Sequence, residues 1–443
     1  MTLPIICIFI LGYMLIAFES YTKINKAAIA LLMSVFCWVL YYAGFGGASH
    51  ENVEMFTAAL GETCEIIFFL MGAMVIVEVV DRNGGFNFVR EKLVSTTKKA
   101  LLWKLIVLSF FLSAVLDNMT TSIVMVLVIS KMIEDRTDKF LYASMIVLAA
   151  NSGGAFSPIG DVTTIMLWVK GNITAGGVIT KLFLPSVVSV IIPGLLIGLR
   201  LKGKISMKTS LVEKETTDII LRKREKSAVF IIGVGGLLFV PIFKILTGLP
   251  PFMGILLILG LLWVVTEFIF HQKRFKKIDP NKLPEVSALL HKTDLSTLLF
   301  FLGILTCVSA LSATGALTKL GNILDQIFNG NAYLITGIIG VLSAIVDNVP
   351  LVASCLEMYD VIPATVSNLE QIAMFGVDGR FWELLAYCAG VGGSMLIIGS
   401  AAGVVVMGIT KIPFGWYFKN ITWIAAAGYF AGMAAYWLQS MIF

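Results

Sequence analysis

Residues 112–118 read LSAVLDN and residues 342–348 read LSAIVDN. Leu, Ser, Ala, Asp and Asn recur in the same order, 230 positions apart. Each heptapeptide interrupts a long apolar stretch with an Asp-Asn pair. Membrane proteins with internal structural repeats show this kind of weak internal similarity. The two heptapeptides therefore predict a chain made of two related halves.

Two further blocks repeat in the same order on either side of these heptapeptides. Their spacing stays close to that of the heptapeptides, which argues against a chance match. The matched positions are Phe69 and Gly72 with Phe300 and Gly303, and Gly153, Gly154 and Gly160 with Gly392, Gly393 and Gly399.

The composition indicates that this chain lies in a lipid bilayer. Hydrophobic residues make up 58% of the sequence and charged residues only 14%, against about 25% charged in soluble domains. A helix needs about 20 apolar residues to cross the bilayer core. Ten stretches approach or exceed that length, some of them interrupted: 3–19, 26–44, 61–81, 140–170, 178–200, 227–246, 252–270, 294–312, 380–409 and 416–440. We predict an all-α integral membrane protein.

Four apolar stretches are interrupted by polar or small residues. Residues 102–131 and 333–359 are each split near the middle, which leaves limbs of about 13 residues that are too short to span the bilayer, so we expect two re-entrant hairpins. Residues 140–170 and 380–409 contain glycine-rich breaks, so we expect two broken helices. Irregular backbone is tolerated at this depth only where it is buried in protein or lines a cavity.

The distribution of Lys and Arg predicts the orientation, because these residues stay on the cytoplasmic side. An outside N-terminus and C-terminus place all but five of the 33 Lys and Arg residues in cytoplasmic segments; the exceptions are Lys170, Lys181, Lys244, Lys319 and Arg380. The first repeat (1–200) then starts outside, and the second repeat (227–443) starts inside after a basic cytoplasmic linker (201–226). The net charge of +5 is a topology signal and does not indicate a nucleic-acid partner.

Asp117 and Asp347 lie at the predicted hairpin tips, followed by Asn118 and Asn348. Ser343 precedes the second tip by four residues. A charged side chain at membrane depth costs at least about 2.5 kcal/mol, so carboxylates there point to function by default. The alternative is that each Asp only caps the backbone of the hairpin turn.

The break in the first half carries more oxygen ligands than the break in the second half. Asn151, Asp161, Thr163 and Thr164 correspond to Gly390, Ser400, Ala402 and Gly403, and Ser394 adds a hydroxyl to the second break. Asp161 could alternatively be only the N-cap of a restarting helix. With Asp117 and Asp347, these residues form an acidic, all-oxygen set, which hard alkali cations prefer over soft transition metals.

This set of residues predicts exchange of Na⁺ for H⁺. Burial and mutual repulsion disfavour three ionised carboxylates (Asp117, Asp161 and Asp347) in one pocket without a cation. Loss of bound sodium should therefore accompany proton uptake. We expect no resident cofactor, because the sequence contains no phosphate loop and no cluster of metal ligands.

At these residues the chain resembles the NhaD-type sodium/proton antiporters of the ion transporter superfamily. The resemblance rests on the segments SAVLDNMTTS (113–122), ANSGGAFSPIGDVTT (150–164), SAIVDN (343–348) and GGSMLIIGSAAG (392–403). It implies exchange of Na⁺ and also Li⁺ for H⁺ in the inner membrane of a bacterium. It also implies a homodimer with a fixed scaffold and a mobile transport domain that moves in elevator fashion. The family's ion site maps onto Asp117, Asn151, Asp161, Thr163, Thr164, Ser343, Asp347 and Asn348, and onto Ser394 and Ser400.

Three other functions remain open from the residues. Sodium-coupled di- and tricarboxylate carriers of the same superfamily have neutral hairpin tips, whereas Asp117 and Asp347 should repel a carboxylate substrate. Arsenite-type efflux carriers are a further relative. An intramembrane aspartyl protease also needs two buried aspartates, but its GxGD motif is absent here, since Asp161 follows Ser-Pro-Ile-Gly.

Overall fold

The computed structural model describes residues 2–17, 24–47, 49–85, 93, 95–204, 222–274, 286–290, 294–345, 347–363 and 368–442. Within these ranges the chain is helical and contains no strand, apart from one bridge between Thr97 and Lys204. The prediction of an all-α chain is confirmed. Most of the predicted linker, residues 205–221, lies outside the described residues.

The helices follow one another along the chain in this order. In the first part of the chain they are α1 (Thr2–Ala17), α3 (Lys26–Gly44), α4 (His50–Arg82), α6 (Lys98–Leu116), α7 (Asn118–Met132), α8 (Arg136–Ala155), α9 (Val162–Val169) and α10 (Ala175–Arg200). After the linker they are α11 (Lys223–Thr247), α12 (Pro251–Arg274), α13 (Val286–Leu290), α14 (Leu295–Ala313), α15 (Ala316–Phe328), α16 (Ala332–Leu342), α17 (Asn348–Met358), α18 (Leu369–Phe375), α19 (Arg380–Gly392), α20 (Ala401–Thr410), α21 (Phe414–Asn420) and α22 (Thr422–Ile442).

Seven helices among the described residues are long and apolar enough to cross a membrane, or eight if one bent pair counts as a span. Six of them match predicted stretches, and the seventh is α6. Of the other four stretches, α1 has only 16 residues, α22 is not among the seven, and two are broken into shorter helices. Residues 140–170 become α8 and α9, and residues 380–409 become α19 and α20. The predicted breaks are therefore present in both stretches.

Two predicted boundaries are wrong. The first limb of the first hairpin is α6, which has 19 residues instead of about 13, because Thr97 caps the helix ahead of Lys98 and Lys99. The last predicted span does not begin at residue 416. Instead, α21 meets α20 at 115°, and α22 starts at Thr422.

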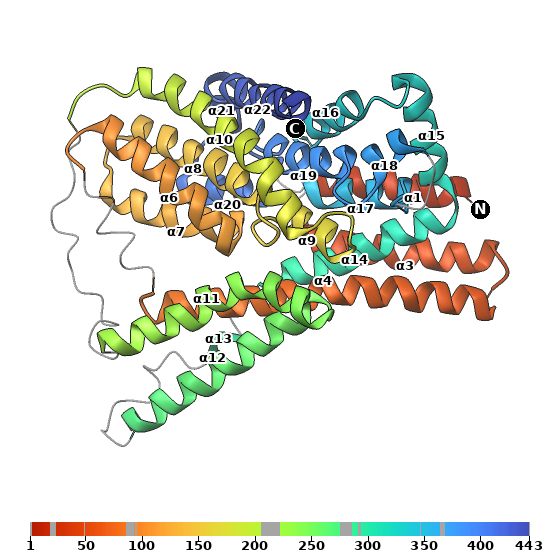
Figure 1. The fold of residues 1–443 in the computed structure, drawn as a ribbon, viewed down its shortest axis with the longest axis horizontal. Helices are drawn as coiled ribbons and strands as arrows, with labels where there is room; N and C mark the ends of the chain where they lie inside the picture. Colours follow the sequence, from red (N-terminus) through yellow and green to blue (C-terminus); the bar gives the residue numbers. More distant parts are fainter. Residues whose placement is uncertain are drawn as a thin grey trace.

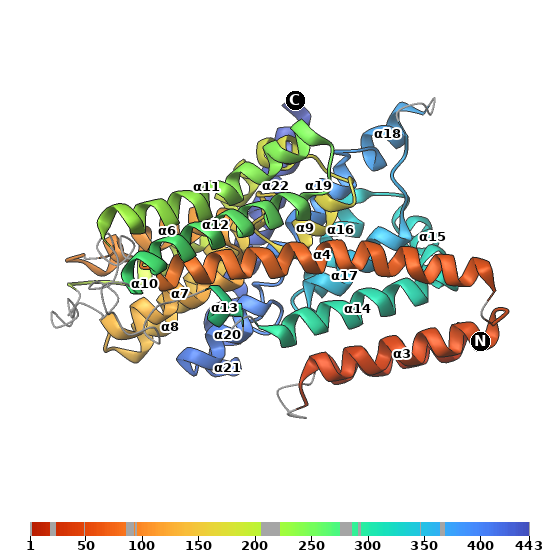
Figure 2. The same ribbon diagram turned by 90° about the horizontal axis from the view of Figure 1, so that it is seen from below.

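The helices pack into two bundles that each combine both parts of the chain (Figures 1 and 2). The scaffold bundle consists of α1, α3, α4, α11, α12 and α14, in which α3 packs against α14 and α4 against α12. The hairpin bundle consists of α6–α10, α16, α17, α19, α20 and α22, in which α6 packs against α8 and α16 against α19. Helix α17 lies at the boundary, because it also packs against α14.

The two interrupted apolar stretches differ in shape. Helices α6 and α7 pack side by side as a hairpin, with Asp117 between them. Helices α16 and α17 both pack against α19, but α17 also packs against α14 and α15 and hardly contacts α16, so the two limbs of the second stretch diverge. In both ribbon views α6 and α7 lie at one end of the molecule, while α16 and α17 lie toward the other (Figures 1 and 2).

The repeated glycines mark matching helix crossings. A Cβ on Gly153 would lie 2.1 Å from the carbonyl oxygen of Phe110 on α6, and a Cβ on Gly392 would lie 2.1 Å from that of Gly340 on α16. Ser113 donates a hydrogen bond to the carbonyl of Ala150 at 2.6 Å; Ser343 donates in the same way to Ala389 at 2.8 Å. Glycine is needed where two helix backbones approach this closely. The sequence repeat therefore encodes the same backbone crossing twice.

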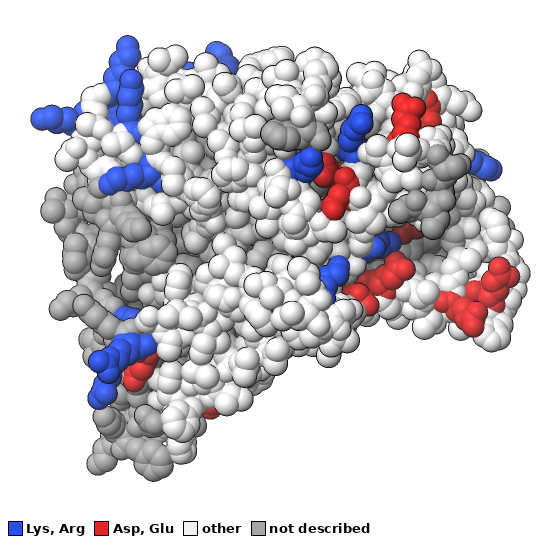
Figure 3. All heavy atoms as spheres, in the orientation of Figure 1, with Lys and Arg blue, Asp and Glu red and all other residues white. Residues whose placement is uncertain are grey.

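Charged side chains are concentrated in two regions along the long axis of the molecule. On the face shown in Figure 3, Lys and Arg gather at the left end, where α6 begins in Figure 1, and most Asp and Glu lie in the right half together with further Lys and Arg. Mostly uncharged surface lies between them. This pattern is typical of a chain with two polar ends and an apolar band.

Gly153→Ala should destabilise the fold by about 1–3 kcal/mol, because the new methyl group forces α6 and α8 apart. The measurement is the thermal unfolding midpoint of the purified protein in detergent. Gly260→Ala, inside α12, is the matched control, because nothing lies within 4 Å of its Cβ position and alanine favours the helix. Equal midpoints for the two variants would contradict the assigned crossing.

Candidate functional site

Four helices of the hairpin bundle begin at predicted site residues. Asp117 caps α7, Asp161 caps α9, Asp347 caps α17 and Ser400 caps α20. In each case the side-chain oxygen accepts a hydrogen bond from a backbone N–H of the first turn. The positive end of the helix dipole also favours a carboxylate at this position. All three aspartates therefore cap helices, and because capping is compatible with ion binding, it does not decide between the two interpretations.

Asp161 is the centre of a buried polar network. Its Oδ1 accepts hydrogen bonds from the backbone N–H and the hydroxyl of Thr163, at 3.1 and 3.0 Å. Its Oδ2 accepts one from the Nδ2 of Asn118 at 2.7 Å. Since a carboxylate has about four acceptor positions, this pattern leaves room for a cation or a proton on Asp161.

Asn151 joins the two parts of the chain at this network. Its Oδ1 accepts a hydrogen bond from Asn118 at 3.0 Å, and its Nδ2 donates to the hydroxyls of Ser394 and Ser400, at 2.8 and 3.0 Å. Asn118, Asn151, Ser394 and Ser400 are all buried. The breaks in α8–α9 and α19–α20 therefore meet at one polar centre.

Asp117 lies at a strained turn. Its backbone φ is +115°, a region that costs a non-glycine residue on the order of 1–3 kcal/mol. Its Oδ1 and Oδ2 accept hydrogen bonds from the backbone N–H and the hydroxyl of Thr120, both at 2.7 Å. The charges of Asp117 and Asp347 both act on Asp161. The turn thus holds a second carboxylate within electrostatic range of Asp161.

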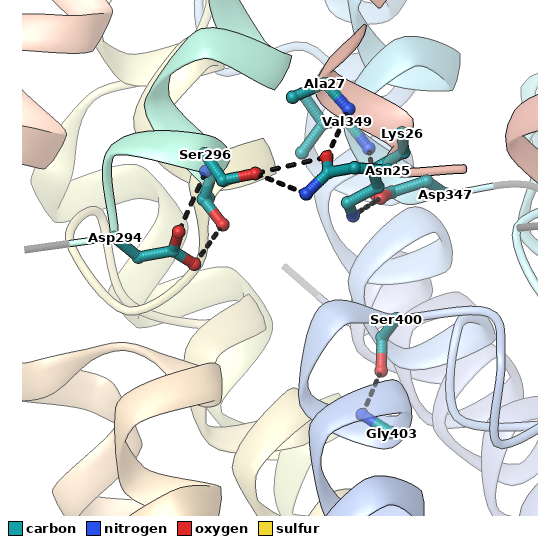
Figure 4. Close-up of polar contacts among 10 residues, drawn as sticks. Asn25, Lys26, Ala27, Asp294, Ser296, Asp347, Val349, Ser400 and Gly403 are labelled. Carbon is teal, nitrogen blue, oxygen red and sulfur yellow. Dashed lines mark hydrogen bonds and ion pairs between the residues drawn. The ribbon is translucent and has the colours of Figure 1, made fainter. Parts of the chain in front are cut away.

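Asp347 has a partner that we did not expect from the sequence. Its Oδ2 lies 3.0 Å from the Nζ of Lys26, the first residue of α3 in the scaffold bundle (Figure 4). Sequence reasoning placed Lys26 among the cytoplasmic loop charges and missed this pair. The contact joins residues 321 positions apart, so no local pattern could have revealed it.

The remaining predicted residues are buried, and each lies near one of these aspartates in the sequence. Thr164 is buried, and its hydroxyl has no hydrogen-bond partner among the described residues. Asn348 is buried at the start of α17. Ser343 is buried too, but its hydroxyl donates a hydrogen bond to the carbonyl of Ala389. Ser343 therefore has a structural partner, whereas Thr164 carries an oxygen that is free to bind a ligand.

The three aspartates do not form one tight cluster. Within the described ranges, no group of three or more His, Cys, Asp and Glu side chains could hold a metal ion. Asp161 and Asp117 instead combine with amide and hydroxyl oxygens, while Asp347 is paired with Lys26. A weakly bound monovalent cation fits these neutral and anionic oxygens better than a tightly held resident metal.

A second ion-pair group joins the two bundles away from this network. The Nζ of Lys170, just after α9, lies 3.0 Å from a carboxylate oxygen of Glu62 on α4 and 2.9 Å from one of Glu357 on α17. The Nζ of Lys244, on α11, donates to the carbonyl of Trp168 at the end of α9. The end of α9 is therefore held by two helices of the scaffold bundle.

Comparison with known proteins places the chain among membrane transporters. The sequence model of the family described as "Citrate transporter" (CitMHS) matches residues 13–377. Sodium/proton antiporter 1 of Arabidopsis thaliana is 44% identical over 434 residues, which cover 97% of this chain and 71% of the relative. The Na⁺/H⁺ antiporter NhaD of Alkalimonas amylolytica is 28% identical over 99% of this chain and 91% of its own length.

The fold also matches a solved transporter structure. The YdaH transporter of Alcanivorax borkumensis superposes with a TM-score of 0.54 at 12% identity, covering 92% of this chain and 97% of that one. Together with the apolar helices, these relatives establish an integral, multi-pass membrane protein, and they confirm that it is a transporter and not an enzyme. The chain belongs to the CitMHS family and, within the ion transporter superfamily, to the NhaD-type sodium/proton antiporters.

Proposed function

We propose that this protein exchanges Na⁺, and also Li⁺, for H⁺ through carboxylates shared by the two ions. The observation that carries the proposal is the buried network in which Asp161, Asn118 and Asn151 meet the hydroxyls of Ser394 and Ser400. It offers oxygen ligands at a break in two helices. The printed names of the Arabidopsis and NhaD relatives support the same ions.

The exchange follows from the charges of this network. Asp161 is almost fully buried, and the charge of Asp117, at the N-terminus of α7, acts on it. Two carboxylates in such a setting are stabilised either by a cation between them or by a proton on one of them. When Na⁺ leaves, a proton takes its place on Asp161 or Asp117. The hydroxyl of Thr164, which has no hydrogen-bond partner in the described part of the chain, adds a neutral ligand for Na⁺.

We propose an elevator mechanism in which the hairpin bundle carries the ion past the scaffold bundle. The division of helices between the bundles supports it, because the first three long helices of each predicted repeat pack together. The matching crossings at Gly153 and Gly392 support two repeats, 1–200 and 227–443. We also propose that both termini lie outside, that the protein lies in the plasma membrane and that it forms a homodimer. In this mechanism, Asp117, Asp161 and Asp347 lie on the moving hairpin bundle.

A second candidate function is transport of citrate or a related carboxylate, because the matching family carries the description "Citrate transporter". The charges of the network oppose it, since Asp117 and Asp161 would repel an anionic substrate. Uptake of labelled citrate into proteoliposomes separates the two functions. Citrate uptake without cation-dependent proton movement would replace the antiporter proposal.

Asp161→Asn and Asp117→Asn should each abolish exchange, because an amide neither binds Na⁺ as a charged ligand nor takes up a proton. The measurement is proton movement in proteoliposomes, followed with a pH-sensitive dye after addition of Na⁺, Li⁺, K⁺ or citrate. The parent should respond to Na⁺ and Li⁺ and not to K⁺ or citrate.

Glu383→Gln is the matched control for these variants. Glu383 is a buried carboxylate on α19 outside the network, and its oxygen accepts a hydrogen bond from Tyr436 that an amide oxygen can keep. This variant should retain exchange. Full exchange in Asp161→Asn would rule out the shared carboxylate.

Thr164→Val should raise the Na⁺ concentration for half-maximal exchange by about five- to tenfold, the loss expected for one neutral ligand. Its thermal midpoint should not fall, because the hydroxyl has no partner among the described residues and valine has the same shape. Ser186→Ala removes another buried hydroxyl, on α10, for which the described ranges also contain no partner, and it should leave Na⁺ half-saturation unchanged. An unchanged half-saturation in Thr164→Val would remove Thr164 from the site.

A further inference from the structure

The pair formed by Lys26 and Asp347 joins the two bundles at the candidate site. Lys26 begins α3 in the scaffold bundle, and Asp347 caps α17 in the hairpin bundle. Their charged atoms are 3.0 Å apart, and their side chains are only 24% and 14% exposed. An ion pair with so little exposed surface is screened much less than a surface pair. Its formation or loss therefore changes the charge felt at the site.

The scaffold bundle positions Lys26 independently of Asp347. The Nζ of Lys26 lies 4.3 Å from the centre of the Phe300 ring on α14, within the range of a cation–π contact. Next to it, Asn25 and Ser296 form side-chain hydrogen bonds at 2.9 and 3.1 Å, which tie the start of α3 to the start of α14 (Figure 4). The ammonium group thus has a place on the scaffold when Asp347 is elsewhere.

The hairpin side of the pair lies next to the predicted ion ligands. Asp347 is followed by buried Asn348, and its charge acts on Asp161. A Na⁺ ion that binds Asp347 would meet the ammonium group of Lys26 at the same carboxylate. Like charges at this distance repel, so the two cations exclude each other.

We propose that Lys26 is an internal competitor of the transported cation at Asp347. With no ion bound, Lys26 neutralises Asp347 and holds the hairpin bundle against the scaffold bundle. When Na⁺ binds, it displaces the ammonium group toward Phe300 and breaks this connection. The inference rests on the proposed cation exchange and adds the residue that couples ion binding to movement between the bundles.

The test compares Lys26→Met and Lys26→Gln with the parent at alkaline pH. Both variants remove the competing charge, so the Na⁺ concentration for half-maximal exchange should fall at least about fivefold, the lower end of measured site couplings. Lys26→Arg keeps the charge and should behave as the parent does. An unchanged or higher half-saturation in folded Lys26→Met and Lys26→Gln would overturn the proposal.

Lys170→Met is the matched control. Lys170 is 25% exposed and also links the two bundles, through Glu62 on α4, and its ion pairs are with Glu62 and Glu357 and not with Asp347. If breaking any link between the bundles were enough, Lys170→Met would lower Na⁺ half-saturation as much as Lys26→Met. That outcome would overturn the role of Lys26 as a competitor.

Na⁺-dependent stabilisation separates this proposal from the proposed exchange. A cation that binds the folded protein raises its thermal midpoint in detergent, and Na⁺ should do so at lower concentrations in Lys26→Met than in the parent. If no proton movement occurs but this shift is seen, the exchange fails and the competition stands. If exchange occurs but the two proteins need the same Na⁺ concentration for their shifts, the competition fails and the exchange stands.

Discussion

The fold depends on satisfying backbone N–H groups where helices begin inside an apolar protein. A helix leaves its first N–H groups without intrahelical partners, and lipid provides none. Asp117, Asp161, Asp347 and Ser400 supply the missing acceptors at four such positions. The same helix starts stabilise negative charge. One constraint therefore explains both why the breaks can exist and why carboxylates are found there.

Close helix packing brings these helix starts together. Gly153 and Gly392 let α8 and α19 lie directly on the backbones of α6 and α16. The serines at the same crossings, Ser113 and Ser343, donate to carbonyls of the opposing helix and so reinforce the contact. Asn151 then spans from one break to the other. Small residues set the distance between the helices, and amides and hydroxyls fill the polar space that remains.

Local patterns were enough to predict much of this architecture. Apolar length, glycine-rich breaks and the repeated Asp-Asn pairs located the helices, the interruptions and most of the network around Asp161. They failed where the answer depends on tertiary contact: the true start of α6, the 115° bend before α21, and the divergence of α16 and α17. Lys26 shows the limit most clearly. Its partner lies 321 residues away, so its charge resembled that of any other loop lysine.

The two parts of the chain share a backbone design but differ in charge. At matching helix starts, Asp161 in the first part corresponds to Ser400 in the second. The strained Asp117 corresponds to Asp347, which is paired with Lys26. With that pair formed, the uncompensated charge of the three aspartates is on Asp117 and Asp161 alone. One Na⁺ neutralises only part of it, and so does one proton. In the proposed exchange, a proton occupies this pair of carboxylates while Lys26 neutralises Asp347, and Na⁺ binds in place of both the proton and the ammonium group.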